Sequence, residues 1–196
     1  MRPATDHRPA ILKTAARLFA QKRYDEVRME DVAAAIGIAK GTIYRFYPDK
    51  EQLYSAICLA SFDELNGQLK ALAAGRQSAR ERLRRMVLCM AEHFHAHRDD
   101  FRVMQQSGGL LVRNRAAFLS RRSASRGSIA KVIRAGQADG EFRNVEPKAA
   151  GDMLLGMIRS MFLFYDPRLT PRELSERILD VFLHGLAPAR SRDNGK

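Results

Sequence analysis

Apolar side chains recur at spacings of three and four residues along the whole chain, and this periodicity predicts a protein built from α-helices. In residues 7–22, for example, Ile11, Ala15 and Leu18 would form one apolar face of a first helix. We find no run in which apolar and polar residues alternate as they do in half-buried strands. The chain has 196 residues, 45% of them hydrophobic, so it can bury a core without disulfides or metal ions. We therefore expect an all-α fold.

Glycine, proline and capping residues mark where the predicted helices begin and end. A short second helix over residues 29–36 stops at Gly37, because glycine readily adopts the left-handed conformation found just past a helix end. A third helix over residues 39–46 follows and ends at Pro48. Asp49 would then cap a long fourth helix that reaches residue 73. Further helices are expected at residues 79–97, 101–106, 115–138, 147–165 and 171–186.

The charge of the chain favours a polyanionic partner. A net charge of +12 and a sequence pI of about 10.3 fit either nucleic acid or an anionic membrane surface. Residues 76–134 hold the largest local excess, with 14 Lys and Arg against 4 Asp and Glu. This basic segment is explained either by a solvated helix surface or by attraction to an acidic effector or to DNA. Its arginines include Arg80, Arg84, Arg113, Arg115, Arg121, Arg122 and Arg126.

No feature of the sequence predicts export or a membrane span. The amino terminus has no apolar run behind its charged residues, so we expect no secretory signal. The most apolar stretch, residues 153–165, is interrupted by Arg159 and is too short to cross a bilayer. Cys58 and Cys89 lack the paired spacing of metal or disulfide motifs. We therefore expect a cytoplasmic protein with reduced thiols, no membrane partner and no cofactor.

Residues 31–47 carry the pattern that points to function, a helix, a glycine turn and a second short helix. Ile38 and Ile43 would fill the angle between the two helices. The second of these helices would then expose side chains that can donate hydrogen bonds to phosphates and base edges, and its size fits the major groove of B-DNA. These side chains are Lys40, Thr42, Tyr44 and Arg45.

The segment from Val32 to Leu53 resembles the amino-terminal signature of the TetR (tetracycline repressor) family. The resemblance rests on Gly37, Lys40-Gly41-Thr42, Tyr44, Tyr47 and Lys50-Glu51-x-Leu53, and it covers about residues 8–55. It implies a nine-helix homodimer with a helix-turn-helix domain in residues 1–50. An effector-binding and dimerisation domain would follow in residues 51–187, with a flexible tail in residues 188–196. The implied function is a repressor that binds a palindromic operator in double-stranded DNA and is released by a small-molecule effector.

The residues expected at the DNA come from this motif and its flanks. Arg28 and Ala39 stand where the family usually has a capping hydroxyl, and each loses a cap that typically contributes about 1 kcal/mol. Tyr44 and Tyr47 could instead be core residues with exposed hydroxyls. Lys50, in the first turn of the fourth helix, suits a phosphate, although it could also be a free surface lysine. The full set is Arg28, Ala39, Lys40, Gly41, Thr42, Tyr44, Arg45, Tyr47 and Lys50.

The last two predicted helices are expected to form the dimer interface, as the resemblance implies. Gly156 and Ser160 lie four residues apart and would let helices approach closely. The alternative is that both helices bury their apolar stripes within one subunit. The expected interface residues are Leu154, Ile158, Phe162, Leu174, Ile178, Leu179, Phe182 and Leu186.

Methionines suggest where an effector would bind. Methionine makes adaptable apolar walls, although ordinary core filling is the better explanation for each residue taken singly. His93 and His97 share a helix face, but His95 points nearly the opposite way, so we expect no metal site. The candidate pocket residues are Met90, His93, Phe94, Met104, Met153, Met157 and Met161.

Two other classes of function fit the sequence less well. An enzyme would need a nucleophile with its base, a phosphate loop or paired carboxylates, and we find no such motif. A protein that coats anionic lipid would need an apolar face matched to lipid, whereas the faces here match one another.

Overall fold

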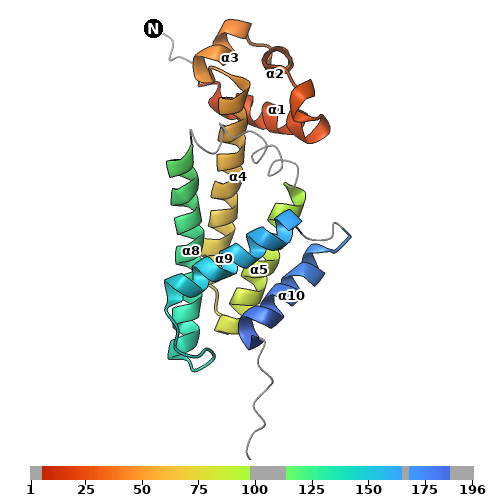
Figure 1. Cartoon of the computed structure of the whole chain (residues 1–196). Coiled ribbons are helices and arrows are strands. Elements are labelled where there is room, and N and C mark those ends of the chain that lie inside the picture. The colour runs from red at the N-terminus through yellow and green to blue at the C-terminus, as the bar shows by residue number, and fades with distance from the viewer. Residues whose placement is uncertain (1–5, 98–113, 165–167, 186–196) are drawn as a thin grey trace, which may run out of the picture. The chain divides into compact units, whose positions relative to one another are not determined.

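The computed structural model describes residues 6–97, 114–164 and 168–185, without the side chains of residues 162–164. Within these residues the chain forms eight α-helices and one 3-10 turn, and no strand, so the expected all-α class is confirmed (Figure 1). The short helix predicted at residues 101–106 lies outside the described residues. The helices are α1 (Arg8–Gln21), α2 (Met29–Ile36), α3 (Lys40–Phe46), α4 (Lys50–Ala73), α5 (Ala79–Ala96), α8 (Arg115–Ala138), α9 (Pro147–Phe164) and α10 (Pro171–His184), with the 3-10 turn η1 at Tyr24–Glu26.

The chain divides into two compact units. Unit 1 comprises Met1–Glu64 and Asp99–Arg121, and unit 2 comprises Leu65–Arg98 and Arg122–Lys196. Both α4 and α8 contain a boundary between the units. No helix of the described part of the chain is long and apolar enough to cross a membrane.

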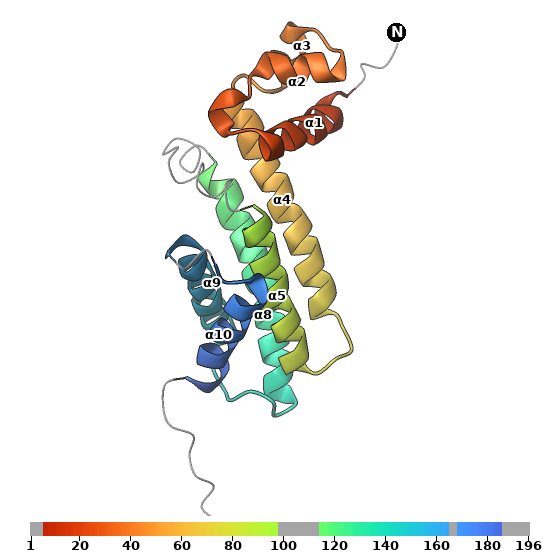
Figure 2. The same cartoon turned by 90° about the vertical axis from the view of Figure 1, so that its right-hand side faces the viewer.

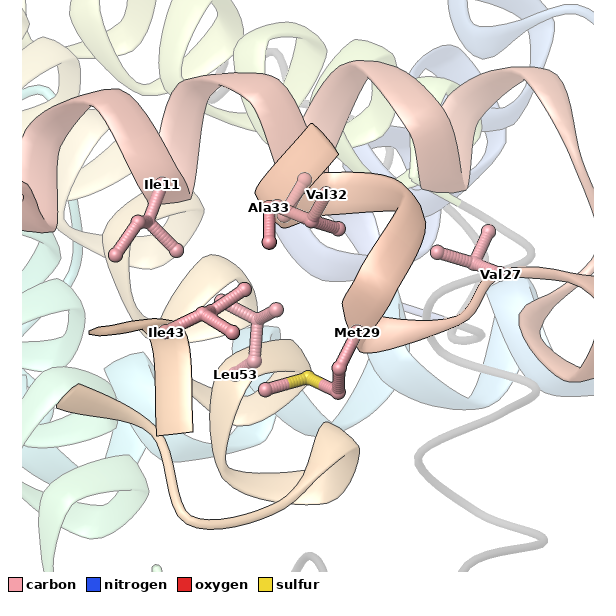
Figure 3. Close-up of a cluster of buried hydrophobic side chains, with 8 residues drawn as sticks. Ile11, Val27, Met29, Val32, Ala33, Ile43 and Leu53 are labelled. Atoms are coloured by element: carbon pink, nitrogen blue, oxygen red, sulfur yellow. The ribbon is translucent and has the colours of Figure 1, made fainter. Parts of the chain in front are cut away.

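The core of unit 1 is a small cluster of aliphatic side chains from α1, α2, α3, the start of α4 and Val27 just before α2 (Figure 3). Burial of each large aliphatic side chain contributes about 1.5–3 kcal/mol. The turn between α2 and α3 depends on Gly37, whose φ of 77° and ψ of 31° are left-handed, as the sequence predicted. The buried members are Ile11, Ala15, Val27, Met29, Val32, Ala33, Ile43 and Leu53, each no more than 5% exposed.

A second, aromatic cluster joins α1, η1 and α4 in unit 1. The Phe19 ring stacks on Tyr24 with centroids 5.7 Å apart, and it meets Tyr54 edge-on at 4.8 Å. Tyr24 and Tyr54 meet edge-on at 5.0 Å. Because Tyr54 is only 2% exposed, this cluster fixes η1 against α4.

Unit 2 packs α5, α9 and α10 against one another, and the two views agree on this arrangement (Figures 1 and 2). The second part of α8 is joined to α9 by Asp152, which accepts hydrogen bonds from Arg122 and Arg126 at 3.2 and 3.1 Å. The buried side chains of this unit include Leu65, Leu69, Leu83, Met86, Val87, Met90, Ile129, Ile133, Leu154, Ile158, Leu174 and Ile178.

The amino terminus of α5 is capped twice. Ser78 Oγ accepts from the Glu81 backbone N–H at 3.2 Å, as is typical of a serine at a helix start. The Glu141 carboxylate, which lies beyond α8 in the sequence, accepts from the N–H groups of Ala79 and Arg80 at 2.8 and 2.9 Å. These bonds hold the pKa of Glu141 below its usual range, and the bond from Arg80 contributes more than the bond from Ala79. The loop after α8 is thereby fastened to the start of α5.

Candidate DNA-binding interface

The side of α3 that faces solvent is determined by the residue that the opposite side of the helix buries in the core. Ile43 is fully buried in the aliphatic core of unit 1 (Figure 3). Lys40, Gly41 and Arg45 are therefore left exposed on this helix, and Thr42 is half-buried. The structure thus brings these predicted DNA contacts together on one short helix, whose size suits the major groove.

Lys40 and Tyr44 are held by an acidic residue of α2. Lys40 Nζ lies 2.7 Å from Glu30 Oε1, and the Tyr44 hydroxyl donates to the same oxygen at 3.3 Å. The Lys40 ammonium also lies 5.8 Å from the centre of the Tyr44 ring. The hydrogen bond from Lys40 is the main cause that lowers the pKa of Glu30, and the same contact raises the pKa of Lys40. Sequence patterns did not reveal Glu30, because a lysine ten residues away on another helix has no periodic relation to it.

At the end of α3, arginines contact the Phe46 ring. The Arg45 guanidinium lies 5.1 Å from the ring centre, and that of Arg8 from α1 lies 5.6 Å from it. Tyr47, just past the helix, is half-buried and packs against the aliphatic core. Burial raises the pKa of Tyr47, so its hydroxyl is a neutral donor.

Lys50 has partners within its own unit. Its ammonium donates to the carbonyl oxygens of Tyr24 and Val27 at 2.9 and 3.2 Å, and it lies 4.3 Å from the centre of the Tyr24 ring. Two of the three ammonium hydrogens are therefore used to hold η1 and the residue after it against the start of α4. This geometry does not fit a free surface lysine, and the phosphate contact that the sequence suggested stays a prediction. Burial, followed by the charges of Glu51, Asp49 and Asp25, raises the pKa of Tyr24 to about 12.

Arg28 and Ala39 lie at the helix starts, where the sequence places them. Arg28 is the N-cap of α2 and Ala39 the N-cap of α3, and both are exposed. Neither side chain has an oxygen that could accept from the helix N–H groups. At α2 the Asp31 carboxylate instead accepts from the backbone N–H of Arg28 at 3.1 Å.

The candidate pocket residues do not all share one environment. Met90 on α5 is fully buried, whereas Met157 and Met161 on α9 are half-buried. Met153 is 66% exposed, which contradicts its assignment to a pocket wall. It follows Gly151 and Asp152, which pack against α8, so its own side chain is turned outward. Met104 lies outside the described residues.

The histidines of α5 form a stacked pair. The rings of His93 and His97 have centroids 4.4 Å apart, and His93 also meets Phe94 edge-on at 5.7 Å. Burial, and then the neighbouring His97, lowers the pKa of His93 to about 4, so His93 is neutral at physiological pH. Phe94 is half-buried beside it. In the described segments no three His, Cys, Asp or Glu side chains are placed to hold a metal ion.

Most of the expected interface residues are buried within their own chain, which corrects that assignment. Phe182 is half-buried, and Leu186 and the side chain of Phe162 lie outside the described part. The stripe chosen from the sequence faces α5 and the neighbouring helices, because spacing alone does not tell which of two apolar faces is internal. The residues with little surface left for a partner are Leu154, Ile158, Leu174, Ile178 and Leu179, each no more than 5% exposed.

Another face of the same two helices is exposed and apolar. Met153 on α9 is 66% exposed and Val181 on α10 is 43% exposed. Gly156 and Ser160 are also exposed, and a side-chain carbon placed at Gly156 would meet no heavy atom of the described chain within 4 Å. Since Met153, Gly156 and Ser160 are three and four residues apart, they lie on one face of α9.

Comparison with known proteins gives consistent results for both parts of the chain. Residues 11–57 match the family profile described as bacterial regulatory proteins, tetR family. Residues 76–186 match the profile described as tetracyclin repressor-like, C-terminal domain. The transcriptional repressor KstR2 of Rhodococcus jostii is 28% identical over 185 residues, which cover 92% of this chain and 91% of the repressor.

Solved structures share the fold over nearly the whole chain. A TetR/AcrR-family regulator from Thermobifida fusca superposes with a TM-score of 0.78 at 28% identity, covering 94% of this chain and 100% of that one. The regulator FadR of Bacillus subtilis, solved in complex with stearoyl-CoA, gives a TM-score of 0.71 at 17% identity and covers 91% and 99%.

Proposed function

The chain belongs to the tetR family of bacterial regulatory proteins, and we propose that the exposed face of α3 reads its operator. The protein is a ligand-responsive transcriptional repressor that binds DNA as a homodimer, and it is not an enzyme. One observation carries the assignment of the reading face. Ile43 is buried, and this leaves Lys40, Gly41 and Arg45 exposed on a helix that fits the major groove.

Each exposed group has a separate role in this proposal. Lys40 and Tyr44 donate to phosphates, which sets affinity for any DNA sequence. Thr42 and Arg45 reach base edges, which sets sequence preference. A side-chain carbon placed at Gly41 would meet no heavy atom of the described chain within 4 Å, so internal packing does not require glycine there. Close approach of the DNA backbone does give glycine a use at this position.

Flanking residues contribute less directly to this interface. Arg28 at the start of α2 and Tyr47 after α3 extend the same surface towards neighbouring phosphates. Ala39 leaves room at the helix start but offers no hydrogen bond. We call α1, α2, α3 and the start of α4 the reading head. We assign Lys50 to the support of the reading head, because its ammonium already binds two carbonyl oxygens.

The exposed face of α9 and α10 is the proposed dimer contact. It contains Met153 and Val181 as apolar anchors, and Gly156 and Ser160 allow a partner helix to approach closely. Phe182, which is half-buried, stays in this assignment. Burial of the two anchors against a second subunit removes from water the exposed large apolar side chains that the structure describes on these helices.

The proposed effector is a coenzyme A thioester of an apolar acid. The FadR structure, solved with stearoyl-CoA, supports this class of molecule. The chain itself offers apolar residues on α5 and α9, Met90 and Met157 among them, for an acyl chain. Its net charge of +12 favours the phosphates of coenzyme A over a neutral ligand. We place the protein in the cytoplasm, where both its DNA and such thioesters are found.

Operator release tests the proposed effector. Stearoyl-CoA should release the dimer from a fluorescent operator duplex, whereas free coenzyme A and free stearate should not at the same concentration. Release requires that the ligand bind the DNA-incompatible state more tightly, and a tenfold loss of DNA affinity corresponds to about 1.4 kcal/mol of this difference. If stearate alone released the dimer, the effector would be a free apolar acid and not a thioester. If neither stearoyl-CoA nor stearate released it, this class of effector would be wrong.

A further inference from the structure

Glu30 on α2 contacts the proposed reading face, and two of the groups proposed to bind DNA, those of Lys40 and Tyr44, meet on it. Lys40 Nζ is 2.7 Å and the Tyr44 hydroxyl 3.3 Å from one atom, Glu30 Oε1. Lys40 is exposed and Glu30 is half-buried, with 66% and 44% of their side-chain surface accessible. The contact therefore lies on the surface that approaches DNA and is open to exchange with solvent and with other anions.

The two donors belong to α3 and the acceptor to α2, so the contact links both helices of the motif. A carboxylate oxygen and a phosphate oxygen are both anionic acceptors and accept from the same kinds of donor. A lysine ammonium and a tyrosine hydroxyl that converge on one anionic oxygen are therefore arranged as they would be around a phosphate.

We propose that Glu30 is an internal competitor for DNA phosphate, which occupies the Lys40–Tyr44 donor pair in the free protein and yields it to the DNA backbone on binding. The inference rests on the proposed role of Lys40 and Tyr44 in phosphate binding. Each reading head then exchanges one anion for another when it binds. The carboxylate keeps both donors ordered in the free protein, and it also lowers affinity for every DNA sequence.

This role differs from that of a residue that orients Lys40 in the complex. An orienting carboxylate stays bound to Lys40 on DNA, so its loss would weaken binding. A competing carboxylate releases Lys40 when the protein binds DNA. Loss of that carboxylate therefore strengthens DNA binding, most of all at low salt, where charge interactions are least screened. The direction of the change in affinity therefore distinguishes the two roles.

The experiment measures the affinity of full-length dimer for an operator duplex and for a scrambled duplex, by fluorescence anisotropy at several salt concentrations. Glu30→Gln removes the charge and keeps the size of the side chain. Asp25→Asn is the matched control, because Asp25 is an exposed acidic residue in the same unit but lies in η1. Thermal melting of each variant confirms that it folds, and Glu30→Ala serves as a second variant.

We expect Glu30→Gln to bind both duplexes more tightly by about twofold to about thirtyfold, since a dimer loses two exposed ion pairs of modest strength. Asp25→Asn should show a smaller gain. In the background of Lys40→Met the substitution at Glu30 should lose most of its effect, because the contested donor is gone. Unchanged or weaker binding by Glu30→Gln, or an equal gain in the Lys40→Met background, would overturn the proposal.

A separate result tests the assumption on which the inference rests. Lys40→Met alone should weaken binding to both duplexes and lower the dependence on salt. If Lys40→Met bound as tightly as the parent, the phosphate role of Lys40 would be wrong. If Lys40→Met weakened binding but Glu30→Gln did not strengthen it, only the competitor role would be wrong.

Discussion

Replacement of Lys50 with methionine separates a residue that supports the reading head from one that binds DNA. Methionine keeps an unbranched apolar stem but removes the ammonium, and with it the hydrogen bonds to the Tyr24 and Val27 carbonyls at 2.9 and 3.2 Å. The contact with the Tyr24 ring, 4.3 Å from the ammonium, is lost as well. The segment that contains η1 would then be held to α4 by the aromatic cluster and by Val27, which packs in the aliphatic core with Leu53.

The size of the effect follows from these contacts. Hydrogen bonds that involve a charged group contribute about 1.5–3 kcal/mol each, and a cation–π contact at an exposed site about 0.5–1 kcal/mol. Lys50 is half-buried, so water can replace part of what is lost. We expect a net loss of about 2 kcal/mol in the unfolding free energy of unit 1, from these values discounted for solvent access. A domain of this size should then melt about 10 °C lower.

Tyrosine fluorescence provides the assay. The chain has 5 Tyr and no Trp, and Tyr24, Tyr44, Tyr47 and Tyr54 all lie in unit 1. Lys22→Met is the matched control, because Lys22 is an exposed lysine at the end of α1 and its loss removes the same charge. Urea unfolding followed by tyrosine emission should shift for Lys50→Met and stay near the parent for Lys22→Met.

Salt dependence decides between support and phosphate binding. Each lost phosphate contact changes the slope of log affinity against log salt by about 0.9, so Lys40→Met should lower it by about 2 per dimer. We expect Lys50→Met to weaken binding with little change in this slope. A Lys50→Met variant with parental stability and a slope lowered as in Lys40→Met would refute the supporting role.

Two further predictions concern the proposed dimer contact and the Glu141 cap in unit 2. Val181→Glu should yield monomers by light scattering, because it places charges in the proposed dimer contact, whereas Ile158→Glu should lower the melting temperature of the monomer itself, since Ile158 is fully buried. Glu141→Gln should lower the melting temperature of unit 2 at neutral pH. The pKa of Glu141 is lowered in the folded state, so its stabilisation is present above the unfolded pKa and is lost as pH falls through the folded pKa. The melting temperatures of Glu141→Gln and the parent should therefore converge in acid, and a constant difference at all pH values would contradict the capping role.

Local signals in the sequence were sufficient to predict where most of the helices begin and end. Gly37 adopts the left-handed conformation expected of it, and the Asp49 carboxylate accepts from the Gln52 N–H at 2.7 Å as a cap. Thr170 accepts from the Glu173 N–H in the same way at 3.2 Å. These signals act within three or four residues, so the sequence displays them directly. The 3-10 turn η1 is three residues long and leaves no periodic trace.

Contacts between distant residues could not be predicted in this way. The partners of Lys50 lie 23 and 26 residues earlier in the chain, and those of Glu141 lie 61 and 62 residues earlier. The dimer interface was predicted on the wrong face for a related reason, because α9 has apolar residues on two sides. Only packing against α5 and α10 shows that Leu154 is buried and Met153 exposed.

The most direct test of the account is whether the dimer reads two half-sites at a fixed spacing. An operator would be selected from random duplexes by the purified protein, and its affinity compared with that of a variant with about five base pairs inserted at its centre. This insertion turns one half-site by about half a helical turn, to the opposite side of the DNA. We expect affinity to fall by at least about a hundredfold, towards the level of non-specific DNA. Equal affinity for both duplexes, or no sequence enriched by selection, would contradict a dimeric reader of a palindromic operator.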